Sequence, residues 1–268
     1  MTPLFSYVFI LEFLGFLFLS PYFYFIEKKT FLYSLFFGLF HSISAFCQSG
    51  LLLTQLKHPY FLTIISFLVF LSSLGFFIVY DIYLLIKKRK KFLSLQSKIN
   101  LTITFFFIVI PTLLFFTLEF NHALKDYSIL QKLGYSLFHS ISSRTSGFTI
   151  FPLTTLSYLS LFITVLIMFI GGASGSTTGG IKLSTFFVLL LSVKAFFKEN
   201  NIVTIFQRSL PLKVFFKAIT LFFITVSFLV FSFSCLLFLE NQSNFFNIFF
   251  FQCHIVHKIN IYTTVKGI

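Results

Sequence analysis

The sequence has little charge, few cysteines and no tryptophan. Only 10% of its 268 residues are charged and only 7 are acidic, whereas 57% are hydrophobic and the mean hydropathy is +0.96. Soluble domains carry far more charge and far fewer apolar residues. The composition therefore excludes a soluble globular protein and predicts an all-α, polytopic membrane protein.

Further absences narrow the function. Cys47, Cys235 and Cys253 lack the spacing of metal ligands or of a disulfide framework. Residues 1–20 lack a basic leading region and a small-residue cleavage site, which predicts a retained span rather than a signal peptide. The net charge is +13, but the lysines cluster just beyond apolar segments, where they set membrane topology. We therefore expect no nucleic-acid partner, no bound cofactor and no structural metal.

The first 98 residues contain two long apolar segments and one short one. Residues 4–26 and 59–86 are long enough to span a membrane, which takes about 20 residues. Residues 31–50 are too short to cross and predict a re-entrant helix followed by a loop. The five basic residues at 87–91 mark the cytoplasmic side.

A second unit over residues 99–197 has the same order. We expect spans at 101–118, with a kink at Pro111, and at 153–197, and a re-entrant segment at 132–147 between them. The pentapeptide at 40–44, FHSIS, recurs at 138–142, and Gly50 and Gly147 follow the two copies. The predicted unit is helix, pore helix, loop, helix, as in K⁺ channels, with both re-entrant segments opening outward.

Residues 210–250 predict an incomplete third unit, of which residues 214–239 are the first span. Residues 251–268 show neither a pore loop nor a closing span. We interpret them as a non-native tail, because the phenylalanine runs before them would be coded by thymine tracts prone to frameshifts.

The most unusual stretch is FIGGASGSTTGGIKLSTF at residues 169–186. Its five glycines each cost a helix about 1 kcal/mol relative to alanine, which predicts a helix broken at 171–182. In hydrocarbon an unpaired amide costs several kcal/mol, so such backbone is tolerated only inside protein or beside water. The stretch therefore predicts an aqueous path. We call residues 171–182 the glycine segment.

The loops after the two short helices are the candidate ion sites. A dehydrated monovalent cation needs several oxygen dipoles around a narrow axis, and carbonyls of a glycine-ended loop supply them. Two ordinary interfacial turns are the alternative. We call residues 47–50 the first loop and residues 144–147 the second loop. The candidate filter residues are Cys47, Gln48, Ser49, Gly50, Arg144, Thr145, Ser146 and Gly147.

Residues 138–148 and 169–182 together resemble the third repeat of the Trk/Ktr/HKT potassium transporter superfamily, closest to its bacterial pore-forming subunits. Residues 40–50 resemble the second repeat, although Cys47 and Gln48 replace the usual asparagines. The resemblance covers residues 1 to about 250. It makes Gly50 and Gly147 filter glycines and the glycine segment a gate. The candidate gating residues are Gly171, Gly172, Ala173, Ser174, Gly175, Ser176, Thr177, Thr178, Gly179, Gly180 and Lys182.

The resemblance also implies K⁺, or possibly Na⁺, as the transported ion, and a homodimer in the bacterial inner membrane with a cytoplasmic nucleotide-binding regulatory ring. Such proteins are transporters rather than enzymes. They carry four pore units, and this sequence matches the second, the third and the start of the fourth. Either another polypeptide supplies the remaining filter segments, or the chain is an inactive, frameshifted remnant.

Several charged or polar residues allow two interpretations. Lys182 either repels or pairs charge in the gate, or marks the start of the next helix; Arg144 either anchors the filter or lies at the surface. Glu12 within a span is functional, near a truncated end, or protonated. Asp81 is expected to pair with the basic residues at 87–91. His41 and His139 are expected to pack and hydrogen-bond rather than to ligate.

Two other motifs point to different classes of protein. Residues 172–175 match the GxSG pattern of intramembrane serine proteases, but the only later histidines are His254 and His257 in the tail. Residues 175–182 resemble a phosphate-binding loop, but Ile181 separates the glycine from the lysine and no strand precedes it. Neither interpretation explains the repeated loops.

Overall fold

The structure is a computed structural model that describes residues 2–55, 58–144, 146–152, 155–197, 204–205, 208–209 and 212–239. The predicted residues Thr145 and His254, the end of the third unit and the tail at 251–268 lie outside these ranges. Apart from one hairpin of two short strands, all regular structure in the described residues is helical, which confirms the all-α prediction.

The first group of elements runs from the N-terminus to the basic residues at 87–91. Its members are α1 (Thr2–Pro21), the π-helical turn η1 (Tyr22–Ile26), α2 (Phe31–Phe46), α3 (Pro59–Leu74) and α4 (Phe76–Ile86). The second group is α5 (Leu95–Leu118), α6 (Ile129–Ser143), α7 (Tyr158–Phe169) and α8 (Leu183–Phe197). The antiparallel hairpin of β1 (Thr204–Ile205) and β2 (Arg208–Ser209) precedes α9 (Leu212–Leu239).

Three of the described helical segments are long and apolar enough to cross a membrane: Phe5–Ile26, Leu95–Leu118 and Val214–Ser232. The pair α3 and α4 qualifies as a fourth only as a broken span, because the two helices are bent by 90° at Gly75. The expected span over residues 59–86 is therefore divided into two helices by a sharp bend. Gly75 adopts a φ of 78°, which residues other than glycine rarely reach, and this ends the helix.

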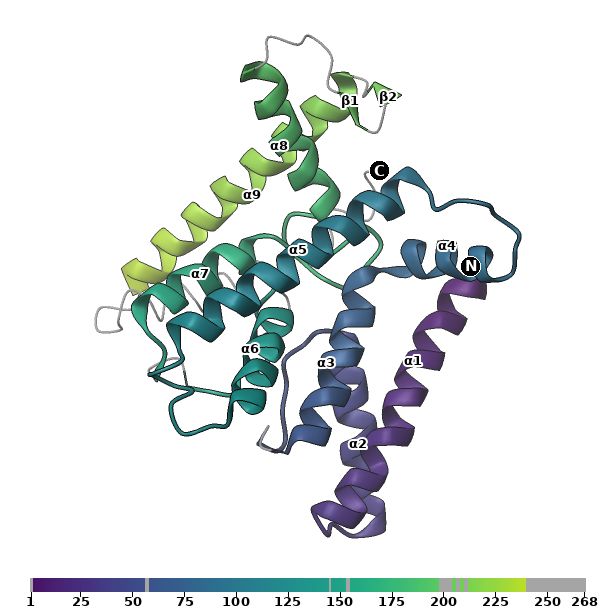
Figure 1. The fold of residues 1–268 in the computed structure, drawn as a ribbon, viewed down its shortest axis with the longest axis vertical. Helices are drawn as coiled ribbons and strands as arrows, with labels where there is room; N and C mark the ends of the chain where they lie inside the picture. The colour runs from purple at the N-terminus through teal and green to yellow at the C-terminus, as the bar shows by residue number, and fades with distance from the viewer. Residues whose placement is uncertain are drawn as a thin grey trace.

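The short helices α2 and α6 pack against the long helices that precede them (Figure 1). Both are followed by an irregular loop and then by a further helix, α3 or α7. Pro111 lies inside α5 without ending it, and this helix begins at Leu95, six residues before the expected start. The element order is thus the same in the two groups.

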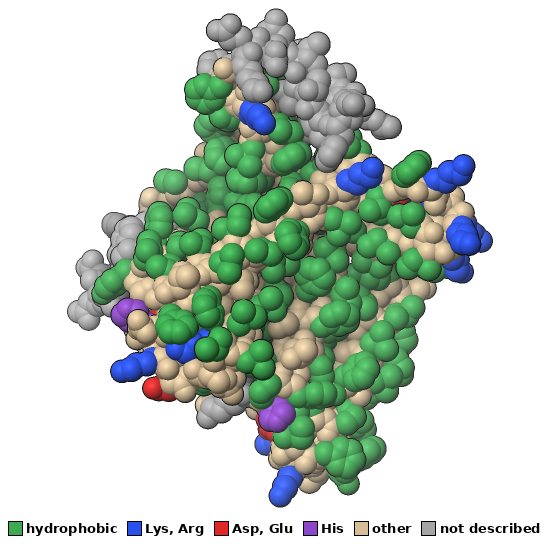
Figure 2. Space-filling view, viewed as in Figure 1, with side chains coloured by type: hydrophobic (Ala, Val, Ile, Leu, Met, Phe, Trp, Pro, Cys, Tyr) green, Lys and Arg blue, Asp and Glu red, His purple; other side chains and the backbone are tan. Residues whose placement is uncertain are grey.

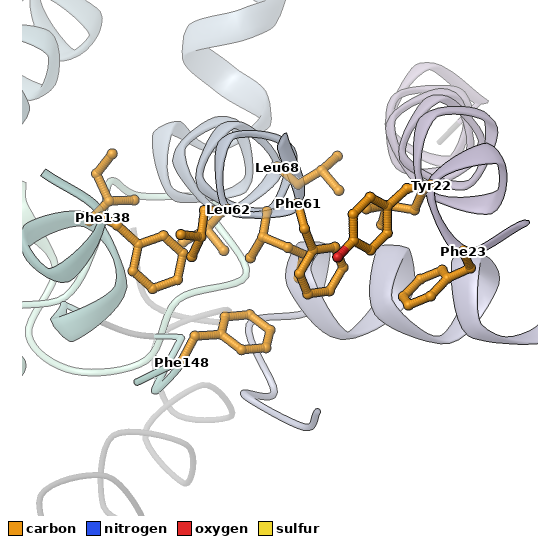
Figure 3. Packing of buried hydrophobic residues seen from close by; sticks show 12 residues of the cluster. Tyr22, Phe23, Phe61, Leu62, Leu68, Phe138 and Phe148 are labelled. Atoms are coloured by element: carbon orange, nitrogen blue, oxygen red, sulfur yellow. The ribbon is translucent and has the colours of Figure 1, made fainter. Parts of the chain in front are cut away.

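The largest hydrophobic core joins the two groups. Figure 3 shows Phe61 and Leu62 of α3 between the aromatic pair Tyr22 and Phe23 on one side and Phe138 and Phe148 on the other. The rings of Tyr22 and Phe61 stack with centroids 5.2 Å apart. Phe138 belongs to α6 and Phe148 follows the second loop. Packing at α3 therefore fixes the second loop against the first group.

The outer face of the molecule is largely apolar. Hydrophobic side chains are spread over much of the face drawn in Figure 2, and large ones such as Phe9, Phe25 and Leu32 are 70 to 77% exposed. Soluble monomers rarely expose contiguous apolar surface on this scale. This surface is suited to contact with lipid.

Candidate functional site

The first loop is folded back onto the end of α2 by serine hydroxyls. The amide of Ser49 donates to the carbonyl of Ser44 at 2.9 Å, and the hydroxyl of Ser44 donates to the carbonyl of Leu51 at 2.8 Å. The Ser44 and Ser49 hydroxyl oxygens lie 2.8 Å apart. Gln48 and Gly50 both have positive φ, 54° and 71°. The loop therefore has a defined non-helical backbone.

The second loop repeats these contacts 97 or 98 positions later. The amides of Ser146 and Gly147 donate to the carbonyl of Ser142 at 3.0 and 3.2 Å. The Ser142 hydroxyl donates to the carbonyl of Phe148, and the Ser146 hydroxyl lies 3.1 Å from that of Ser142. Gly147 has a φ of 72°, close to that of Gly50. Equivalent serines thus build equivalent turns in the two groups.

The two loops lie against each other. A Cβ atom added to Gly50 would collide with the carbonyl oxygen of Ser146 and would lie 3.3 Å from the carbonyl carbon of Gly147. Any side chain at residue 50 would therefore push the loops apart, in addition to the strain of its left-handed backbone. Glycine at this position is required by two independent features of the geometry.

Two long polar side chains of the loops point to the C-terminal end of α3. The side-chain amide nitrogen of Gln48, Nε2, donates to the Ser72 hydroxyl at 2.6 Å and to the Val69 carbonyl at 3.2 Å. The Arg144 guanidinium is 1% exposed and donates from Nη2 to the Ser73 hydroxyl at 3.2 Å. The surface alternative for Arg144 is therefore wrong. The two loops are thus tied to adjacent serines of α3, Ser72 for the first loop and Ser73 for the second, and the sequence pattern identified neither.

The two repeated histidines make hydrogen bonds behind the loops. His41 is fully buried, with Nδ1 2.7 Å from the Phe37 carbonyl and Nε2 accepting from the Leu53 amide at 3.2 Å. His139 lies 3.2 Å from the Thr164 hydroxyl through Nε2. Among the described residues no group of three or more metal-ligating side chains occurs. Both histidines therefore pack and hydrogen-bond.

The glycine segment is an irregular loop between α7 and α8. The Gly171 amide donates to the Ile181 carbonyl at 2.9 Å, and the Ile181 amide donates to the Phe169 carbonyl at 3.3 Å, so the two ends run side by side. A Cβ atom at Gly171 would collide with the Gly179 carbonyl. The glycines thus permit a close approach of two backbone strands.

Polar groups in the interior of the glycine segment are hydrogen-bonded to Thr178. The Gly172 amide donates to the Thr178 hydroxyl at 2.9 Å, and the Lys182 ammonium donates to the Thr178 carbonyl at 2.5 Å. Lys182 is 6% exposed and pairs with no carboxylate of the described residues. It directly precedes α8, but its ammonium is turned into the glycine segment. The segment therefore carries a buried positive charge.

The glycine segment is attached to both the first group and the bend at Gly75. The Ala173 amide donates to the Ser73 carbonyl at 3.0 Å, and the Phe76 amide donates to the Gly175 carbonyl at 3.1 Å. The Thr177 hydroxyl donates to the carbonyl of Phe46, the last residue of α2, at 2.9 Å. The segment thus lies at the C-terminal end of α2, the helix that carries the first loop.

Three other acidic residues have defined partners. Asp81 forms an ion pair with Lys90 at 2.6 Å, as predicted. Glu12 lies 3.9 Å from the Cys47 thiol, next to the first loop. Glu119, which the sequence did not single out, accepts from the amide and hydroxyl of Ser157 at 2.9 and 2.8 Å. The one sequence signal that could have identified Glu119 is its position directly after a span, where a carboxylate often marks a turn.

Comparison with known proteins decides the family. A family model described as TrkH, cation transport protein, matches residues 1–253. The chain belongs to the TrkH family. The resemblance seen in the two loops and the glycine segment is thereby confirmed. The TrkH family is a family of transporters rather than of enzymes, which disfavours the serine protease interpretation of residues 172–175. In the structure the Ser174 hydroxyl lies 2.8 Å from that of Ser184.

Curated relatives of this TrkH-family chain include two bacterial uptake proteins. The potassium/sodium uptake protein NtpJ of Enterococcus hirae is 33% identical over 71% of this chain and 44% of its own length. The Ktr system potassium uptake protein B of Bacillus subtilis is 34% identical over 81% of this chain and 50% of its own. The chain thus spans about half the length of these relatives.

The fold of the TrkH family is also seen in a solved structure. The crystal structure of the potassium transporter TrkH from Vibrio parahaemolyticus matches with a TM-score of 0.70 at 20% identity, over 87% of this chain and 50% of that one. The chain is accordingly a multi-pass protein of the inner membrane.

Proposed function

We propose that this chain forms part of a transmembrane pathway for K⁺, in which the first and second loops provide two of the segments of a selectivity filter. The observation that carries the proposal is the contact of Gly50 with Ser146 and Gly147. Two turns of the same construction, from two groups of the same element order, meet at one place. Curated relatives named as potassium or potassium/sodium uptake proteins support K⁺, with Na⁺ as a second ion.

The filter acts through backbone oxygens. A bare monovalent cation loses its hydration shell in a narrow passage, and carbonyl dipoles replace the lost water without placing a fixed charge in the membrane. The serine contacts of both loops hold the backbone in a fixed shape, and the glycines allow the loops to approach. A closed ring of ligands requires further pore segments beside these two, which we expect a second copy of this chain to supply.

The glycine segment acts as the gate. Its position at the end of α2 places it next to the path that leaves the first loop. The buried Lys182 ammonium disfavours a cation nearby, since like charges repel strongly where the local dielectric is low. Hydroxyl groups can pair with the freed amides in more than one backbone arrangement, so the segment can move at modest cost. Transport needs no resident cofactor in this scheme.

The assembly follows from the same proposal. We expect a homodimer in the bacterial inner membrane that contacts a cytoplasmic nucleotide-binding ring. The names of the relatives as components of Ktr systems support a partner of this kind. The partner would meet the side that carries the basic residues at 87–91, because an excess of such residues marks the cytoplasmic side.

Growth of a K⁺-uptake-deficient bacterium on low-K⁺ medium tests the function. The wild-type chain should restore growth, and Gly50→Ala should abolish the rescue because its Cβ collides with Ser146. Gly134→Ala is the matched control, since no atom lies within 4 Å of a Cβ atom there. No rescue by the wild-type chain, with protein present in the membrane, would favour an inactive remnant. Equal rescue by Gly50→Ala would contradict the filter.

A further inference from the structure

The axis of helix α4 is roughly perpendicular to that of α3, the helix before it. It is bent by 90° from α3, and it extends from the bend beside the N-terminal part of α1 (Figure 1). The rings of Tyr7 in α1 and Phe76 at the start of α4 lie 6.0 Å apart. If α3 runs across the membrane, α4 runs along its surface. The basic residues at 87–91 place that surface on the cytoplasmic side.

One face of α4 is aromatic and open. Phe77, Tyr80 and Tyr83 recur every three residues and are 40 to 56% exposed, whereas Ile78 and Asp81 on the other face are buried. Tyr80 and Tyr83 stack with ring centroids 6.3 Å apart. Tyrosine and other amphipathic rings favour the membrane interface, where one end is apolar and the other is wet.

The basic residues form an ordered turn at the end of this face. The amides of Arg89 and Lys90 donate to the Leu84 carbonyl at 2.9 and 3.3 Å, which folds the turn onto α4. Asp81 holds it there, since it pairs with Lys90 and accepts from the Ser97 hydroxyl at 2.6 Å. The turn is therefore built into the fold instead of being a loose tail.

Most of the positive charge in the turn has no acidic partner. Within the described part of the chain, Lys90 alone forms an ion pair, with Asp81. Lys87 lies over the Tyr83 ring at 4.8 Å, and Lys87, Lys88, Arg89 and Lys91 are exposed. Figure 2 shows Lys and Arg side chains gathered beyond an apolar face at this corner of the molecule. A ligand with negative charge and an adjoining apolar part would complement both features.

We propose that the aromatic face of α4 and the basic turn at 87–91 form a binding surface for anionic phospholipids of the cytoplasmic leaflet. The lipid phosphates contact the basic side chains, and the adjoining acyl chains cover Phe77 and Tyr80. A soluble acidic protein would meet the same charges but would leave the aromatic face in water. The combination of in-plane orientation, aromatic face and unpaired positive charge therefore favours lipid.

Bound lipid would also act on the bend at Gly75. The Phe76 amide at the start of α4 donates to Gly175 of the glycine segment. A Cβ atom at Gly75 would lie 2.8 Å from the Ser176 nitrogen, so the bend and the segment are in close contact. Lipid that fixes α4 at the membrane surface thus restrains one attachment of the glycine segment. The binding surface itself does not depend on the proposed ion.

Spin-labelled lipids test the proposal directly. The full chain is reconstituted in phosphatidylcholine vesicles that contain spin-labelled phosphatidylglycerol or spin-labelled phosphatidylcholine, and the motionally restricted fraction of each is measured. We expect the phosphatidylglycerol label to be preferred at low salt. At 1 M salt the preference should disappear, because the Debye length falls to about 3 Å.

The variant Lys87→Gln/Lys88→Gln/Arg89→Gln/Lys91→Gln should lose most of the preference and keeps the Lys90 ion pair. One basic residue near an anionic surface contributes about a fivefold preference, so the loss should be at least about fivefold. Lys28→Gln/Lys29→Gln, at the other end of α1, is the matched control and should keep the preference. An absent preference in the wild-type chain, or equal losses in both variants, would overturn the proposal. The turn would then be free for a soluble partner.

Discussion

Arg144 is a buried cation whose hydrogen bonds are incomplete within the described part of the chain. Its Nη2 donates to Ser73, but its Nε and Nη1 have no partner among the described residues. Leaving donors of a charged group unmet is costly, so the residue does little for stability. Its place between the second loop and α3 indicates that it positions the loop.

The substitution Arg144→Met separates these roles. Replacing a buried charge with an apolar side chain of similar size is often neutral or stabilising. We expect the thermal midpoint in detergent to stay the same or rise, while rescue of growth on low K⁺ is lost. A fall of the midpoint by more than about 5 °C, which exceeds a loss of 1 kcal/mol, would show that Arg144 is mainly structural.

Glu119 makes the stability dependent on pH. Burial by itself would raise its pKa, but hydrogen bonds from Ser160, Ser157 and Ala123 outweigh burial and hold the pKa below its ordinary value of 4.5. The unfolded chain therefore binds the proton more readily than the folded chain. The stabilisation is complete above the ordinary pKa and is lost as the pH falls through the lowered one.

Glu119→Gln should remove this dependence. At neutral pH the variant should be less stable than the wild type by about 1–3 kcal/mol, because charged hydrogen bonds are replaced by weaker ones. Thermal unfolding in detergent from pH 7 downward should show the two midpoints converging. A constant difference between them at all pH values would mean that the carboxylate charge is not what stabilises the turn.

Residues of the candidate site could be predicted where a local sequence pattern marks them. Residues that owe their role to contacts distant in the sequence could not. Gly50 and Gly147 stand out because each follows a repeated pentapeptide and supplies a conformation that other residues avoid. Ser73 has no such signal, because its role depends on Arg144, which is 71 residues away. The partner of Thr177 is 131 residues away in sequence. Such pairs exist only once the helices are packed.

At the scale of elements, the glycine segment depends on a few hydrogen bonds to its neighbours. The bond from the Thr177 hydroxyl to the Phe46 carbonyl joins the segment to the end of α2. If the segment closes the path in this arrangement, loss of that bond favours the open one. One hydrogen bond contributes about 1 kcal/mol, which corresponds to a shift of about fivefold in the ratio of open to closed.

Thr177→Val should therefore increase ion flux by up to about fivefold relative to the amount of protein. Thr220→Val is a suitable control, because the Thr220 hydroxyl donates only to the Phe216 carbonyl on the exposed side of α9. Uptake of ⁸⁶Rb⁺ into vesicles measures both. Unchanged or lower flux in Thr177→Val would mean that this contact does not hold a closed state.

Helix order could be predicted from apolar length, but the bend between α3 and α4 could not. Residues 59–86 are continuously apolar, which is the pattern of a single span. Gly75 by itself does not predict a bend, since one glycine is tolerated inside many helices. The bend becomes favourable because the glycine segment supplies partners for the backbone there, at Ser73 and Phe76. These partners come from about 100 residues later in the chain.

At the scale of the whole molecule, membrane insertion and family follow from composition and motif. The low charge, the apolar spans and the basic turn led to a multi-pass membrane protein, and the glycine segment led to the TrkH family. How many loops close the filter is a property of an assembly larger than these residues. The described part of the chain contains two adjoining loops, which we propose to line one ion path.

Uptake of ⁸⁶Rb⁺ into vesicles that contain the purified chain tests this claim most directly. The account predicts saturable uptake above that of protein-free vesicles, with K⁺ competing better than Na⁺. Gly147→Ala should abolish it, because this residue has a φ of 72° and adjoins Gly50, while Gly134→Ala should not. Uptake no higher than in protein-free vesicles, or equal uptake in Gly147→Ala and the wild type, would contradict the account.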